Sequence, residues 1–163
     1  MKENPTKLFT FASRNTENIK RGVEAKRWAV ATVSDTAMKS RRTKAQRNLI
    51  VGSKGLLYCN PLHSFTVPFV VTAPPDLEAV VTNIWPEAWV LPFGIEPLGD
   101  ISKRVSKEEA QARWPFLAHR MSFEGYNSVS AAMNFTGTTI FVPLEISDQD
   151  WELILSDLAS GRQ

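Results

Sequence analysis

The chain has 163 residues and a net charge of +2, and 43% of its residues are hydrophobic. This length suits a single domain over residues 1–163, because a chain of this size buries roughly two-thirds of its unfolded surface. The lone cysteine, Cys59, excludes a disulfide framework and a cysteine-based metal site, and His63 and His119 have no partners at metal-ligand spacing. No apolar run approaches the ~20 residues of a membrane span. We therefore expect a protein of the reducing cytoplasm with no membrane partner and no cofactor.

The N-terminal region predicts a strand, a basic helix and a second strand. Lys7–Ser13 mixes leucine, phenylalanine and threonine, as strands do. Ser13–Asn18 gathers side chains that cap helices, so a helix is expected over Thr16–Lys26. Its few apolar positions indicate a surface helix with a narrow buried stripe. Trp28–Ser34 is rich in β-branched residues and predicts the second strand.

The next segment concentrates positive charge. No acidic residue occurs from Thr36 to Pro75, and the cations in this region are Lys39, Arg41, Arg42, Lys44, Arg47 and Lys54. Asp35–Asn48 has neither a helical nor a strand period, so we expect a long loop that is partly disordered in the unbound protein. The charge asymmetry suits a polyanionic partner, and a solvated basic loop is the alternative.

Strands dominate the middle of the chain. Leu49–Cys59 and Phe65–Thr72 each predict a strand, and Pro68 marks an edge or a bulge in the second. A turn over Trp85–Trp89 leads into a further strand over Val90–Glu96.

The C-terminal third predicts two capped helices and a last strand. Ser106 to Glu109 forms a capping box, so a helix should run to about Arg113 and stop at Trp114-Pro115. The last strand is expected within Met133–Leu144, centred on 138–142. Ser147 begins a final helix, and Trp114 and Trp151 are expected in the core. Strands interrupted by short helices, without regular alternation, predict an α+β fold with a curved mixed sheet or a small barrel.

The stretch Ser13–Ile19, SRNTENI, followed by Trp28, resembles the start of a YTH domain, a family that binds N6-methyladenine. The segment 141–144, FVPL, ahead of an acidic helix resembles the EVE domains, which belong to the same PUA-like superfamily. The resemblance covers residues 7–34 and, more loosely, 80–98. It implies a PUA-like fold and a prokaryotic YTH/EVE-like domain. Such a domain acts alone or as the specificity module of a modification-dependent restriction or regulatory system, with a nuclease or ATPase as partner.

The same resemblance implies an aromatic cage for an unpaired or flipped base. Trp28 and Trp85 match the first two cage tryptophans, and Trp89 is the candidate for the third wall. The resemblance places the side chain of Asn18 on N1 of the base and the main-chain carbonyl of Ser13 on its N6–H. The set of base-binding candidates is Trp28, Trp85, Trp89, Asn18, Ser13 and Arg14, and the phosphate-binding candidates are Lys20, Arg21, Lys39, Arg41 and Arg42.

No nucleophile, metal or phosphate-loop motif is evident, so we expect a binding domain and not an enzyme. Several alternatives stay open. An EVE-like domain would bind a modified cytosine in DNA. A PUA-like module would bind RNA or a protein without selecting a modified base. An enzyme on the same barrel would reveal itself by turnover or metal dependence.

Overall fold

The computed structural model describes residues 6–160. Its strands form one mixed sheet of eight strands, in the order β2-β6-β4-β3-β1-β8, with β5 beside β6 and β7 beside β4. Only the pair of β1 and β3 is parallel; the other described pairs are antiparallel. The strands are β1 (Thr6–Ser13), β2 (Arg27–Ala31), β3 (Lys54–Cys59), β4 (Ser64–Ala73), β5 (Val80–Val81), β6 (Trp89–Pro97), β7 (Val105–Ser106) and β8 (Leu144–Ile146).

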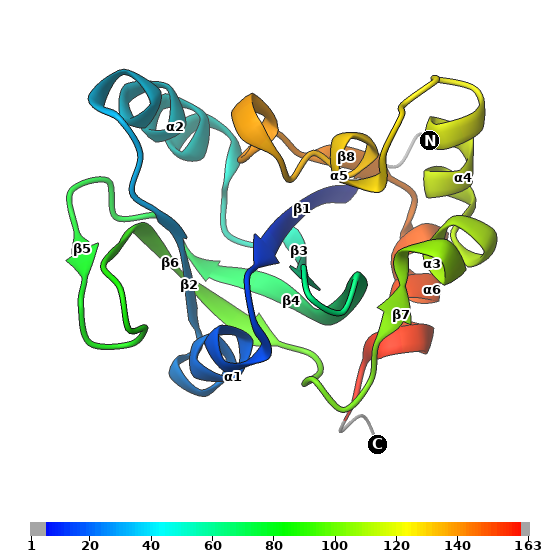
Figure 1. Cartoon of the computed structure of the whole chain (residues 1–163), viewed down its shortest axis with the longest axis horizontal. Helices are drawn as coiled ribbons and strands as arrows, with labels where there is room; N and C mark the ends of the chain where they lie inside the picture. The colour runs from blue at the N-terminus through cyan, green and yellow to red at the C-terminus, as the bar shows by residue number, and fades with distance from the viewer. Residues whose placement is uncertain (1–5, 161–163) are drawn as a thin grey trace.

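Helices lie around this sheet, with α2 at one end and α3, α4 and α6 grouped at the other (Figure 1). They are α1 (Thr16–Ala25), α2 (Asp35–Asn48), α3 (Lys107–Arg113), α4 (Pro115–Ser122), α5 (Val129–Ala132) and α6 (Asp148–Leu158), with a 3-10 turn, η1, at Gly137–Thr139. The predicted α+β fold with a mixed sheet is confirmed. The sheet is open, because β2 and β8 stand at opposite ends of the strand order and do not pair within residues 6–160.

The hydrophobic core consists of two clusters. The first, which we call the tryptophan cluster, contains Trp28, Trp85 and Trp89 with phenylalanines from β1 and β6. The second, the helical cluster, contains residues from the helices α3, α4, α5 and α6 and from the strands β1, β3 and β8. Trp114 and Trp151 belong to it and are buried as predicted. The candidate site belongs to the first cluster.

The loop predicted over Asp35–Asn48 is wrong, because this segment is helix α2. Ser34 caps the helix by accepting a hydrogen bond from the Ala37 N–H at 3.3 Å. Only Met38 and Ala45 are buried, so the hydrophobic period that predicts a helix is missing. The helix is instead fixed by polar side chains that donate to main-chain carbonyls: Arg42 to Leu77, Lys44 to Thr138 and Asn48 to Phe141.

The strand predicted over 138–142 is also wrong. Gly137 and Phe141 have φ angles of 57° and 69°, in the left-handed region that a strand does not use. The β-branched residues there form η1 and a turn, and β8 begins only at Leu144. The helices α4 and α5 were not predicted.

Other local predictions are confirmed. Pro68 lies opposite Leu56, next to a register shift between Leu56 and Tyr58, which is the expected bulge. The capping box predicted at Ser106 forms, and the helix predicted to start at Ser147 is α6, which the structure shows to begin with a capping box as well. Among the described residues, no helix is both long and apolar enough to cross a membrane.

Candidate functional site

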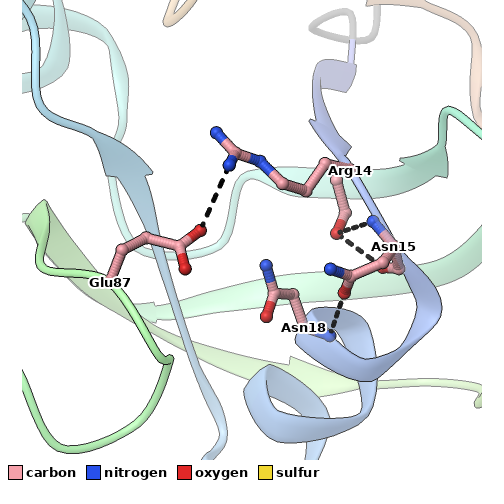
Figure 2. Close-up of polar contacts among 5 residues, drawn as sticks. Arg14, Asn15, Asn18 and Glu87 are labelled. Carbon is pink, nitrogen blue, oxygen red and sulfur yellow. Dashed lines mark hydrogen bonds and ion pairs between the residues drawn. The ribbon is translucent and has the colours of Figure 1, made fainter.

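The start of α1 is built by a polar cap. The Asn15 side chain accepts a hydrogen bond from the Asn18 N–H at 2.8 Å, and the Ser13 hydroxyl donates to the Asn15 carbonyl at 2.7 Å. Asn15 is therefore the capping residue. Asn18 lies in the first turn, and this turn directs its side chain into the protein (Figure 2).

The side chain of Asn18 is buried without a partner. The residue is 1% exposed, and neither its amide nitrogen nor its amide oxygen forms a hydrogen bond within the described residues. Its main-chain carbonyl does have a partner, because it accepts from the Trp85 indole N–H at 2.9 Å. An unpaired buried amide costs about 1–3 kcal/mol, so such a group calls for an explanation, and a role in binding is one.

The three predicted cage tryptophans lie together. The rings of Trp85 and Trp89 stack with centroids 4.3 Å apart, and the Trp28 ring meets both at steep angles, with centroids 5.6 Å and 5.2 Å away. Their position follows from the pairing of β2 with β6, where Ala31 lies opposite Trp89. At 4.3 Å no third ring fits between Trp85 and Trp89, so a base would have to enter beside this stack.

A pocket of about 260 Å³ opens beside the stack. Trp28 and Trp89 line it, together with Ser13 and Arg14 from the β1–α1 junction and Arg41 from α2, whereas Trp85 and Asn18 do not. This volume is close to the lower end of the roughly 300 Å³ or more that is usual for small-molecule sites. The pocket is thus large enough for one planar ring and polar at its rim.

The Ser13 carbonyl, which the resemblance assigns to the N6–H of the base, already accepts a hydrogen bond from the Asn60 N–H at 2.9 Å. Asn60 follows β3, which pairs with β1 in parallel so that Ser13 lies opposite Cys59. A carbonyl oxygen has two lone pairs, and one of them is therefore occupied.

An ion pair joins the two sides of the site. Figure 2 shows Arg14 reaching from the β1–α1 junction to Glu87 on the turn between Trp85 and Trp89, where the charged atoms are 3.8 Å apart. One carboxylate oxygen of Glu87 and the indole N–H of Trp89 are buried without hydrogen-bond partners in the described part of the chain.

The predicted phosphate-binding residues are dispersed. Arg41 lines the pocket, and burial lowers its pKa from the ordinary value, yet a guanidinium stays charged at neutral pH. Lys39 is exposed on α2, and Arg42 donates to the Leu77 carbonyl at 3.1 Å. Arg21 pairs with Glu17 at 3.5 Å, and Lys20 lies by a separate hollow that Glu17 and Glu24 also line.

Sequence reasoning missed Asn15, Asn60 and Glu87. Asn15 could have been found as the helix cap, because it stands three residues before Asn18, whose N–H donates a hydrogen bond to it. Glu87 could have been found because it stands between Trp85 and Trp89, two of the predicted cage residues. Nothing in the sequence indicates Asn60, because its position depends on the parallel pairing of distant strands. Within residues 6–160, no group of three His, Cys, Asp or Glu side chains is arranged to hold a metal ion.

Solved structures share this fold. The YTH domain of Zygosaccharomyces rouxii MRB1 in complex with N6-methyladenosine RNA is 16% identical, with a TM-score of 0.55 over 100% of this chain and 92% of that chain. The YTH domain of Pho92 in complex with m6A is 15% identical, with a TM-score of 0.55 over 100% and 90% of the two chains. Protein Atu2648 from Agrobacterium tumefaciens is 14% identical, with a TM-score of 0.50 over 96% and 97%.

These likenesses show that the chain has the fold of YTH domains, as the resemblance in its sequence implied. No protein-family model and no curated protein matches the sequence.

Proposed function

We propose that the protein is a nucleic-acid reader that captures an unpaired or flipped N6-methyladenine beside its tryptophan stack. The observation that carries this proposal is the buried, unpartnered amide of Asn18, a residue whose main-chain carbonyl is bonded to Trp85 in the cluster of three indoles. An amide supplies both a donor and an acceptor without bringing a charge, which suits the edge of a base. The YTH domain of MRB1, which shares the fold, was solved with N6-methyladenosine RNA.

In this proposal the base enters through the pocket next to Trp28 and Trp89. Because Asn18 does not line that pocket, the turn between Trp85 and Trp89 moves so that the Asn18 amide can donate to N1. Burying the methyl group contributes only roughly 0.8 kcal/mol, so the methyl group alone gives weak selectivity. Hydrogen bonds to the base edge supply the rest, because a base that cannot complete them leaves polar groups unpaired.

Affinity that does not depend on base identity would come from phosphate contacts. Arg41 and Lys39 on α2 are the proposed contributors, and their share of the binding should weaken as salt rises. The target base must be unpaired or flipped out of a duplex at a cost of a few kcal/mol, because a stacked base cannot reach such a pocket. Any catalysis, such as cleavage of the nucleic acid by a nuclease or ATP hydrolysis by an ATPase, would be carried out by a partner protein.

Calorimetry tests this proposal with short single strands, in RNA and DNA form, that carry N6-methyladenine, adenine or 5-methylcytosine. We expect the N6-methyladenine strand to bind about 1–3 kcal/mol more tightly than the adenine strand. Trp28→Ala should remove most of this difference, because one wall of the pocket is lost. Trp114→Phe, which alters the helical cluster, serves as the matched control.

Equal affinity for the adenine and N6-methyladenine strands would contradict the proposal. A preference for 5-methylcytosine would support the EVE-like alternative, and an absence of binding to any strand would support a protein-interaction module. Circular dichroism should accompany Trp28→Ala, since this indole is only 1% exposed and its loss also lowers stability.

A further inference from the structure

We propose that Glu87 is a specificity-determining residue whose carboxylate accepts a hydrogen bond from the exocyclic N–H of the bound base. The site would then select bases that keep one hydrogen on that nitrogen. This inference rests on the proposed function, because it names the chemistry by which the proposed base site distinguishes its ligands. Glu87, like Asn18, does not line the pocket, but its ion-pair partner Arg14 does.

The position of Glu87 supports this role. It lies between Trp85 and Trp89, and its side chain and that of Asn18 extend toward each other below Arg14 in Figure 2. One of its carboxylate oxygens has no exposed surface and no hydrogen-bond partner within residues 6–160. The guanidinium of Arg14, at 3.8 Å, is too distant for a hydrogen bond. A buried carboxylate oxygen in this state is an available acceptor.

The other proposed acceptor is partly occupied. The Ser13 carbonyl accepts from the Asn60 N–H at 2.9 Å, so the N6–H of a base would have to share that oxygen. The Glu87 oxygen accepts no hydrogen bond from the described residues, although it is the oxygen that lies 3.8 Å from the Arg14 guanidinium. Charge-assisted hydrogen bonds to carboxylates are also stronger than those between neutral groups.

Asn18 and Glu87 together complement one kind of base edge. N6-methyladenine presents an acceptor at N1 and a single donor at N6, and the two side chains supply a donor and an acceptor in turn. An ionised carboxylate only accepts. A base with an oxygen in place of the N–H group would turn a lone pair toward the Glu87 carboxylate. A base with a second methyl group in place of the hydrogen would turn that methyl group toward it. Either base should be rejected.

Arg14 forms an ion pair with the Glu87 carboxylate in the unbound protein. Its side chain is 71% exposed and that of Glu87 is 42% exposed, so the pair is weak and exchangeable. A phosphate of the ligand can take over Arg14 as the base N–H takes over Glu87. Each half of the ion pair therefore matches one part of a nucleotide.

The test compares three single strands that differ at one atom group: N6-methyladenine, 6-methoxypurine and N6,N6-dimethyladenine. The wild-type protein should bind the first at least about tenfold more tightly than the other two, as expected for a hydrogen bond to a charged group. Glu87→Met should reduce this ratio to near one. Glu87→Gln keeps an acceptor oxygen and should retain part of the ratio, which a purely structural role for Glu87 does not predict.

Glu96→Gln is the matched control, because Glu96 also pairs with a cation, Lys26, at 3.5 Å, but the two residues line a separate hollow. It should leave the ratio unchanged. Glu87→Ala is a second variant of different size, in case Glu87→Met disturbs the tryptophan stack, and it should behave in the same way.

Different results would contradict the proposed function and the inference about Glu87. If the wild type does not prefer N6-methyladenine over adenine, the proposed function is wrong. If that preference holds but Glu87→Met and Glu87→Ala still discriminate against 6-methoxypurine, another group accepts the N–H and the inference about Glu87 is overturned.

Discussion

The side chain of Asn18 lowers stability in the unbound protein, because both polar atoms of its amide are buried and unpaired among the described residues. The amide does not support α1 either, since Asn15 caps that helix through its own side chain. Under the proposed function, binding and folding therefore place opposite demands on this residue, as is common in binding sites.

We predict that Asn18→Ala leaves the free energy of unfolding unchanged or raises it by about 1 kcal/mol. Removal of an unpaired buried amide is favourable, and the small cavity that remains offsets part of the gain. Urea denaturation measures this effect, and calorimetry with the N6-methyladenine strand should show weakened binding.

Asn15→Ala is the matched control for this substitution. It should lower the free energy of unfolding by about 1 kcal/mol through loss of the cap, while the preference for the methylated strand remains. A larger loss of stability in Asn18→Ala than in Asn15→Ala would mean that the Asn18 amide has a structural partner.

At the scale of elements, α2 brings two neighbouring arginines into different surroundings. Arg41 lines the pocket and has no part in the ion pairs of residues 6–160. Arg42 donates to the Leu77 carbonyl and so fixes the helix to the segment that precedes β5. The first arginine is free to meet a phosphate, whereas the second has a structural role.

We therefore predict that Arg41→Glu weakens binding to methylated and unmethylated strands alike and flattens the salt dependence. Phosphate contacts carry no base information, so the ratio of the two affinities should persist. Arg42→Glu should weaken binding less and lower stability instead. Titrations at several salt concentrations measure the slopes, and a loss confined to the methylated strand in Arg41→Glu would show that Arg41 contacts the base.

The helices and strands also show which sequence patterns were sufficient to predict local structure. The start of α1 and the capping boxes at Ser106 and Ser147 were predictable, because each depends on residues within four positions of one another. Helix α2 was not, because long-range bonds from its polar side chains replace a buried face. The segment 138–142 has the composition of a strand, but the left-handed conformation of Phe141 allows its ring to pack against Phe11.

The features of the candidate site also include some that the sequence could predict and some that it could not. The three tryptophans and Asn18 were predictable from a motif that resembles a known family, and the fold brings them together. The closed stack of Trp85 on Trp89 and the acceptor on Glu87 were not, because both depend on the conformation of the turn between the strands.

At the scale of the whole molecule, the core consists of two clusters, and the three tryptophans proposed to contact the base belong to the first. Leu117 is fully buried in the helical cluster and does not line the pocket, although Phe135 of the same cluster does. We predict that Leu117→Ala lowers the free energy of unfolding by about 2–5 kcal/mol, because it leaves a cavity. The affinity ratio for methylated and unmethylated strands should not change below the unfolding temperature. A changed ratio would show that the two clusters are coupled.

The pairing of β1 affects how the protein is made. β1 pairs with β3 in parallel on one side and with β8 on the other, where Thr6 lies opposite Ile146. The Thr6 hydroxyl also donates to Asp148 in the first turn of α6. On the ribosome, β1 can pair with β3 once Cys59 has been made, but its other edge must wait for β8, which is made more than a hundred positions later. Contacts so distant in the chain slow folding, so that edge of the first strand stays exposed during most of synthesis.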